Sequence, residues 1–127
     1  MKVRDVMTED LVTAAADDPA EEVFKEFVSL SVHGVPVLDD DGTLVGLVTS
    51  TDVVRALASG DWEHMKASDL AREPVTVAPD DDLEKALDAM AAQGQDRAVV
   101  VEDGKVVGVV TVMDVLPAVL NEEGSER

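Results

Sequence analysis

Two threonine–aspartate pairs are the groups in this sequence best suited to recognise a small ligand. Thr49 and Asp52 follow the apolar run at residues 44–48, and Thr111 and Asp114 repeat the pair 62 positions later. At a helix start such a pair can cap the helix, because its oxygens bond to the first amides. The same helix start favours phosphate, and a carboxylate can bind the two hydroxyls of a ribose. Helix capping alone and ligand binding are therefore both open interpretations.

The two copies differ beside these pairs. The first copy carries Ser50 and Arg55, whereas the second has Val112 and Pro117 at the matching positions. Arg55 could neutralise a phosphate, or it could form an ordinary salt bridge on the helix surface. Pro117 is expected to break or kink its helix, because proline lacks the amide hydrogen. The first copy therefore suits a phosphate better, and the second is expected either to bind more weakly or to prefer a less charged ligand.

The pairs belong to a longer internal repeat. The segment LVGLVTSTDV at residues 44–53 returns as VVGVVTVMDV at residues 106–115, with six of ten positions identical. Matches extend to both sides of this segment, and the small changes in spacing fall where loops are expected. We expect one motif at residues 1–59, a linker at 60–66, a second motif at 67–121 and a flexible tail at 122–127.

Each repeat predicts the order strand, helix, strand, strand, helix, which is a mixed α/β (α+β) fold. Short apolar runs at residues 11–14 and 75–78 predict the first strands. Asp-Gly turns at residues 41–42 and 103–104 predict β-hairpins, and the last helices should end near residues 59–60 and 121. The first helix of each repeat should bury an apolar face, composed of Val23, Phe24, Phe27, Val28 and Leu30 in one and Leu83, Ala86, Leu87 and Met90 in the other.

Composition restricts the environment and the partners of this chain. Its 127 residues include 28 acidic and 10 basic side chains, for a formal net charge of −18, and they include no cysteine. Such a surface repels nucleic acid and anionic lipid, and the absence of cysteine excludes disulfides and thiolate metal sites. No signal peptide or long apolar run is present, so we expect a cytoplasmic protein without a membrane partner. The acidic, lysine-poor and aromatic-poor composition resembles proteins of salt-accumulating halophiles, including halophilic archaea.

The ordered pair of repeats resembles the CBS domain, which occurs in tandem pairs called Bateman modules. The resemblance rests on the opening VRDVMTEDLVT, on HGVPVLDDDGTLVGLVTSTDV, and on the second copy ASDLAREPVTV with RAVVVEDGKVVGVVTVMDV. It implies two motifs related by pseudo-two-fold symmetry, with their sheets packed together, helices outside and two clefts. In the family these clefts often take AMP, ADP, ATP or S-adenosylmethionine, and the pairs commonly form dimers.

The resemblance also implies roles for individual residues. The aspartates would bind ribose, and the threonines phosphate or ribose. His33 and Arg97, at the entry of the second strand, would contact phosphate, while Thr13 and Thr76 would line the adenine pocket. Each of these four has a plainer alternative as a structural residue of its strand. The full set of candidate ligand contacts is Thr13, His33, Thr49, Ser50, Asp52, Arg55, Thr76, Arg97, Thr111 and Asp114.

These observations predict a regulatory module and not an enzyme, because no nucleophile or base with an orienting partner is evident. The module would bind an adenosyl ligand, change conformation, and act on an effector protein in trans as a homodimer. No cofactor or resident metal is required, and Mg²⁺ would enter only with a nucleotide. The alternative is a ligand-independent structural or dimerisation module whose Thr–Asp pairs only cap helices. A third hypothesis is an S-adenosylmethionine or metal-linked sensor.

Overall fold

A computed structural model describes residues 1–30, 32 and 34–125, with the side chains of 122–125 left out. The chain forms two compact units. The first unit is Val12–Pro74, and the second unit joins Met1–Leu11 to the chain from Val75 onward. The sequence repeats and the compact units therefore have different boundaries, because the opening residues of the chain pack with the later repeat.

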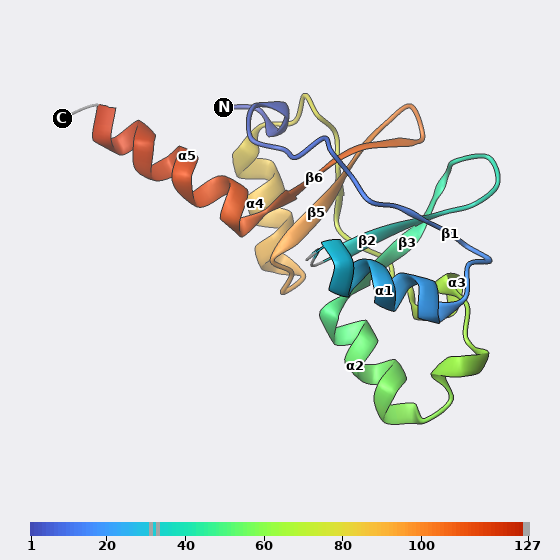
Figure 1. Ribbon diagram of the computed structural model, residues 1–127. Helices are drawn as coiled ribbons and strands as arrows, with labels where there is room; N and C mark the ends of the chain where they lie inside the picture. Colours follow the sequence, from blue (N-terminus) through green and yellow to red (C-terminus); the bar gives the residue numbers. More distant parts are fainter. Residues whose placement is uncertain (31, 33, 126–127) are drawn as a thin grey trace. The chain divides into compact units, whose positions relative to one another are not determined.

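The first unit is a three-stranded sheet with helices packed against it (Figure 1). The strand order is β1-β2-β3, with β1 parallel to β2 and β2 antiparallel to β3. Its core is composed mainly of valine and alanine, including Val23, Val35 and Val48, which are fully buried. The elements are β1 (Ala14–Ala15), α1 (Ala20–Leu30), β2 (Gly34–Leu38), β3 (Leu44–Thr49), α2 (Ser50–Ser59), the 3-10 helix η2 (Trp62–His64) and α3 (Ala67–Leu70).

The second unit repeats this arrangement with the strand order β4-β5-β6. Its core again consists of small apolar side chains, with Val3 contributed by the opening segment of the chain. The elements are η1 (Val3–Asp5), β4 (Thr76–Val77), α4 (Leu83–Ala92), β5 (Arg97–Glu102), β6 (Lys105–Thr111) and α5 (Val112–Ser125). The predicted order of elements and the mixed α+β class are both confirmed.

Three details differ from the expectations. The first strand of the chain is Ala14–Ala15, later and shorter than predicted, and Val28 and Leu30 are exposed instead of buried. Helix α5 passes through Pro117 and continues to Ser125, beyond its expected end. Proline deprives only the carbonyl four residues earlier, that of Met113, of its helical partner. The Met113 side chain is 69% exposed, so water can reach this part of the helix.

In each unit, a short segment that is distant in the sequence forms backbone hydrogen bonds near the start of the unit's first helix. In the second unit the Leu83 amide donates to the Met1 carbonyl at 2.9 Å, and the Val3 amide donates to the Asp81 carbonyl at 2.9 Å. In the first unit, the Ala20 amide bonds to Met65 and the Ala67 amide to Asp18, at 3.0 and 2.8 Å. Residues 1–11 of the second unit are thus the structural counterpart of residues 65–74 of the first.

The repeated glycine explains how these segments reach the sheets. The backbones of Leu47 and Arg72 exchange two hydrogen bonds, of 2.9 and 3.0 Å. A Cβ atom on the neighbouring Gly46 would lie 2.9 Å from the Ala71 Cβ and 3.0 Å from the Arg72 carbonyl oxygen. The same close approach occurs in the second unit, where Gly108 faces residues 7–8. Glycine is required here because the incoming backbone occupies the space of a side chain.

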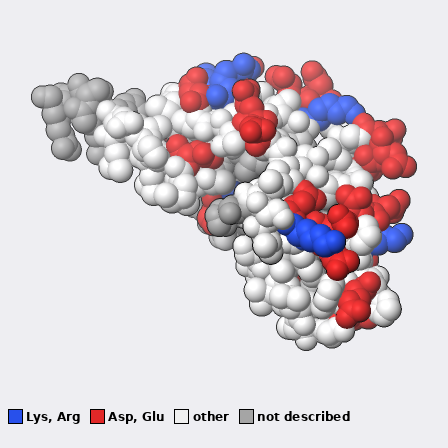
Figure 2. All heavy atoms as spheres, viewed as in Figure 1, with Lys and Arg blue, Asp and Glu red and all other residues white. Residues whose placement is uncertain are grey.

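Acidic side chains gather in clusters on the face shown in Figure 2, with few basic side chains between them. Several basic side chains of the chain are held in ion pairs with carboxylates, such as Lys2 with Asp82 at 2.7 Å. The surface charge therefore remains strongly unbalanced even after this local pairing.

Within the described part of the chain, no helix is both long and apolar enough to cross a bilayer.

Replacing Gly46 with alanine tests the close approach. We expect Gly46→Ala to lower the free energy of unfolding by about 1–3 kcal/mol, because the Ala71–Arg72 backbone must move aside. Chemical denaturation monitored by circular dichroism measures this loss. Val45→Ala, at an exposed neighbouring position, is the control and should cost less. An equal effect of the two substitutions would contradict the explanation.

The charge imbalance predicts that salt stabilises the fold. Raising KCl from about 0.1 M to about 2 M shortens the screening length from about 10 Å to under about 3 Å, which weakens repulsion between carboxylates. The melting temperature should rise by several degrees. Sodium acetate and KCl at matched ionic strength should act alike if screening is the cause. A melting temperature that is flat or falls with KCl would show that repulsion does not limit stability.

Candidate functional site

The first candidate site is the start of α2, where Asp52 is the centre of the hydrogen bonding. Asp52 is 5% exposed and is the buried charged residue of the described chain. Its Oδ2 accepts the Thr49 amide at 2.8 Å and the Thr49 hydroxyl at 3.0 Å. Thr49 has extended backbone angles and ends β3, so the helix begins directly where the strand stops. The strand and the helix are therefore joined by this threonine–aspartate contact.

Arg55 occupies the second oxygen of the same carboxylate. Its Nη1 donates to Asp52 Oδ1 at 2.9 Å, one helical turn along α2. The side chain of Arg55 is 54% exposed, so this ion pair contributes only modestly to stability. The exposed guanidinium can still offer its remaining N–H groups to an anion. The salt bridge, one of the two roles considered for Arg55 from the sequence, is present. A second role for Arg55 in binding a ligand is compatible with this salt bridge.

The second candidate site is the start of α5, and it is built differently. Asp114 Oδ2 accepts the Thr111 amide at 2.9 Å and the Thr111 hydroxyl at 3.1 Å, as in the first site. Its Oδ1, however, accepts the hydroxyl of Thr8 at 3.2 Å, and Pro117 stands at the position of Arg55. A hydroxyl from the opening segment thus takes the place of a guanidinium. The sequence analysis did not identify Thr8, because it lies 106 residues from its partner.

Arg97 lies at the edge of the second site. It opens β5 and pairs in register with Thr111 on β6. Its side chain is only 14% exposed, and it donates two hydrogen bonds to Asp96, of 2.8 and 3.1 Å. The Asp96 carbonyl in turn accepts the Val112 amide at the start of α5. Arg97 is therefore held beside the helix start by the adjacent carboxylate. His33, the candidate at the strand entry of the first repeat, falls outside the described residues.

Thr13 directly precedes β1 and Thr49 ends β3, so β2 lies between them in the sheet. β1 runs parallel to β2, and Gly34 at the start of β2 pairs with Thr49. The residue that precedes β1 therefore lies at the end of the sheet where α2 begins. In the second unit, Thr76 on β4 pairs with Val99 on β5, whereas Thr111 on β6 pairs with Arg97, two residues nearer the end of the sheet. Thr13, Thr76 and Ser50 are all exposed, and Arg55 lies one turn inside α2.

Substitutions at the start of α2 separate the cap from the ion pair. Asp52→Ala should lower the free energy of unfolding by about 1–3 kcal/mol, because two Thr49 donors and Arg55 lose their acceptor. Arg55→Ala should cost less, about 1 kcal/mol at most, because its side chain is half exposed. Chemical denaturation compares the two variants. A larger cost for Arg55→Ala would contradict this ranking.

Comparison with known sequences identifies the repeat. The CBS domain family matches residues 3–59 and 67–121. The uncharacterised protein YlbB of Bacillus subtilis is 34% identical over 129 residues, covering 99% of this chain and 85% of YlbB. The uncharacterised protein MJ1225 of Methanocaldococcus jannaschii is 30% identical over 113 residues, and the match covers 88% of this chain and 40% of MJ1225. This chain thus corresponds to under half of MJ1225.

Solved structures share the fold. CBSX2 in complex with AMP is 28% identical with a TM-score of 0.84, covering 96% of this chain and 98% of that chain. The CBS domain pair of MJ0100, in complex with 5′-methylthioadenosine and S-adenosyl-L-methionine, is 25% identical with a TM-score of 0.86 and the same coverage. The two family matches together span most of the sequence, and the structure contains two repeated units. The chain belongs to the CBS domain family and contains a tandem pair of CBS domains.

Proposed function

We propose that this protein is a regulatory module that binds an adenine nucleotide or a related adenosyl compound at the helix starts. The observation that carries the proposal is the pair of threonine–aspartate helix starts in a fold whose solved relatives hold AMP or S-adenosylmethionine. A helix start favours phosphate, and an aspartate at its edge can accept two ribose hydroxyls. CBS domain pairs of this kind are regulatory and not catalytic.

The two sites favour different parts of such ligands. At the first site, Arg55 supplies a positive charge to a chain with a net charge of −18, so a phosphate gains most there. At the second site, Thr8 and Pro117 take the place of Arg55, and the nearby Arg97 is already paired with Asp96, which favours an uncharged or positively charged adenosyl compound. AMP, ADP or ATP is therefore the ligand class for the first site, and any Mg²⁺ arrives with the nucleotide.

The regulatory output would come from a shift between conformations. Asp52 accepts hydrogen bonds from Thr49 and Arg55, so a ribose at its carboxylate must displace at least one donor. Binding then changes the contacts that hold β3 to α2 and favours one arrangement of the unit over another. We infer that an effector protein recognises this change in trans.

Exposed apolar side chains support a homodimer. Val54 and Leu57 on α2, and Met113, Leu116 and Leu120 on α5, are all exposed. Apolar residues at this spacing form a stripe that a second copy could cover.

The net charge of −18 argues against nucleic acid as a partner, because both would be negatively charged. The same charge is consistent with the salt-rich cytoplasm of a halophile, where salt would screen the repulsion between two copies.

A ligand-independent structural module is the second candidate function. It is favoured by one observation, namely that both carboxylates already accept hydrogen bonds from within their own units. In this case the threonine–aspartate pairs would only cap helices and join them to the sheets. The two functions agree on stability and differ on whether an adenosyl compound binds.

Calorimetric titration in molar KCl separates the two functions. AMP, ATP and S-adenosylmethionine are titrated into the parent protein and into Asp52→Ala, Asp114→Ala and Asp40→Ala variants. Asp40, an exposed hairpin carboxylate, is the matched control. We expect AMP or ATP to bind the parent, with a loss of about tenfold or more in Asp52→Ala and little change in Asp40→Ala.

S-adenosylmethionine should be affected more by Asp114→Ala than by Asp52→Ala if the second site takes the less charged ligand. No heat from any of the three compounds, together with loss of stability in both aspartate variants, would favour the structural function. Undiminished affinity in both variants would reject the ribose assignment.

A further inference from the structure

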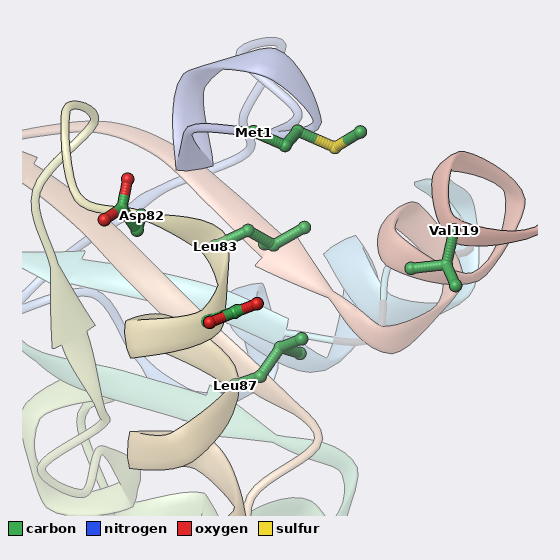
Figure 3. Close-up of a pocket in the computed structure, with 6 residues that line it drawn as sticks. Met1, Asp82, Leu83, Leu87 and Val119 are labelled. Atoms are coloured by element: carbon green, nitrogen blue, oxygen red, sulfur yellow. The ribbon is translucent and has the colours of Figure 1, made fainter. Parts of the chain in front are cut away.

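The segment that completes each unit has the same register in both units. In the second unit the Leu83 amide donates to the Met1 carbonyl, and in the first the Ala20 amide donates to the Met65 carbonyl. Figure 3 shows the Met1 and Leu83 side chains, which belong to the lining of a pocket of about 480 Å³. Met1 thus matches Met65, 64 positions later, and the residues that follow them match one by one.

Thr8 and Arg72 are counterparts in this register. The backbone of Thr8 exchanges two hydrogen bonds with Val109 on β6, of 2.9 and 3.0 Å, and Arg72 exchanges two of the same lengths with Leu47 on β3. Both pairs are antiparallel. The register of an antiparallel pair decides the face from which each side chain leaves the strand. The side chains of Thr8 and Arg72 therefore leave the backbone on equivalent sides of the two sheets.

The hydroxyl of Thr8 shows what lies on that side. It donates to Oδ1 of Asp114 at 3.2 Å. The equivalent oxygen of the first unit is Asp52 Oδ1, which accepts a hydrogen bond from Arg55. Arg72 therefore leaves its strand toward the Asp52–Arg55 ion pair, and its exposed side chain is long enough to extend beyond the pair into solvent. All three residues belong to one compact unit.

Arg72 has no carboxylate partner among the described residues. The sequence has 28 acidic and 10 basic residues, so carboxylates are abundant around any arginine. An exposed guanidinium that still remains without one can offer all of its N–H groups to an anionic ligand. Every other arginine that the structure describes pairs with an aspartate, namely Arg4 with Asp80, Arg55 with Asp52 and Arg97 with Asp96.

Arg72 gives the two candidate sites different charges. In the first site, Arg55 and Arg72 are two cations around one carboxylate, Asp52. In the second site, Asp114 faces a threonine in place of Arg72, and Arg97 is paired with the aspartate beside it. A chain of two or three phosphates carries more negative charge than a single phosphate, so it gains more from a second guanidinium.

From this placement, we propose that Arg72 is a second phosphate-binding residue of the first site, and that it selects nucleoside diphosphates and triphosphates over monophosphates. Arg55 comes from α2 and Arg72 from the segment that follows α3, so the two guanidinium groups can bind different phosphates of one ligand. The proposal rests on the proposed function, because it places a ribose at Asp52. It adds a residue and a ligand class to that function.

Calorimetric titration of ATP and AMP into charge variants tests the selectivity, at one KCl concentration at which the parent is folded. The matched control is Lys25→Gln, which removes an exposed cation of the same unit from α1. We expect ATP to bind Arg72→Gln about tenfold more weakly than the parent, and AMP to lose about threefold or less. Arg72→Lys should recover part of the loss, and Lys25→Gln should change little.

Inorganic pyrophosphate tests Arg72 without the adenosyl part of the ligand. It is titrated into the ¹⁵N-labelled protein, and the amide signals of residues 50–55 are followed by NMR. We expect saturable shifts in the parent and in Lys25→Gln, and a loss of saturation in Arg72→Gln. The melting temperature of Arg72→Gln should match that of the parent, because Arg72 has no carboxylate partner to lose among the described residues.

The outcomes separate this proposal from the proposed function. ATP binding that requires Asp52 but is equal in the parent and in Arg72→Gln would overturn the role of Arg72 and leave the proposed function standing. Pyrophosphate binding that requires Arg72, without binding of ATP or AMP, would support the second cation and overturn its selection of nucleotides. Equal losses in Arg72→Gln and Lys25→Gln would overturn the proposal, and so would a parent that binds neither ATP nor pyrophosphate.

Discussion

Each unit depends on the pairing of a glycine-bearing strand with a short segment that lies far from it in the sequence. Leu47 pairs with Arg72, and Val109 pairs with Thr8, each through two backbone hydrogen bonds. These pairs can form only because Gly46 and Gly108 leave room for the incoming chain. The segments also place Val3, Ala67 and Leu70 in the two cores, so they contribute apolar burial as well as hydrogen bonds.

The residues that recur in both repeats determine the fold, and the residues that differ determine the surroundings of the two aspartates. Glycine, threonine and aspartate recur because each unit must admit a segment and then turn from strand to helix. The polar groups around the two aspartates differ between the copies, because Arg55 contacts Asp52 and Thr8 contacts Asp114. The segment that completes the second unit therefore also shapes its candidate site. A change in that segment would affect the fold and the second aspartate together.

Local patterns in the sequence predict most of the fold. The hairpins follow from Asp-Gly turns, and the start of α2 follows from Thr49 and Asp52, because these signals lie within a few residues. Three features could not be predicted, because they depend on residues that only the folded backbone brings together. They are the packing of residues 1–11 in the second unit, the Thr8–Asp114 contact, and the pocket lined by Met1, Leu83, Leu87 and Val119. The exposure of Val28 was also missed, since helical spacing alone does not show how wide the buried face is.

Native-state hydrogen exchange after deletion of residues 1–8 tests the central claim most directly. These residues open the first repeat in the sequence, but they pack within the second unit. We predict that amide protection is lost in residues 75–121, β5 and β6 above all, while β2 and β3 stay protected. Loss of protection in residues 12–59 with residues 75–121 unaffected would show that each repeat folds on its own opening segment, and would contradict the account.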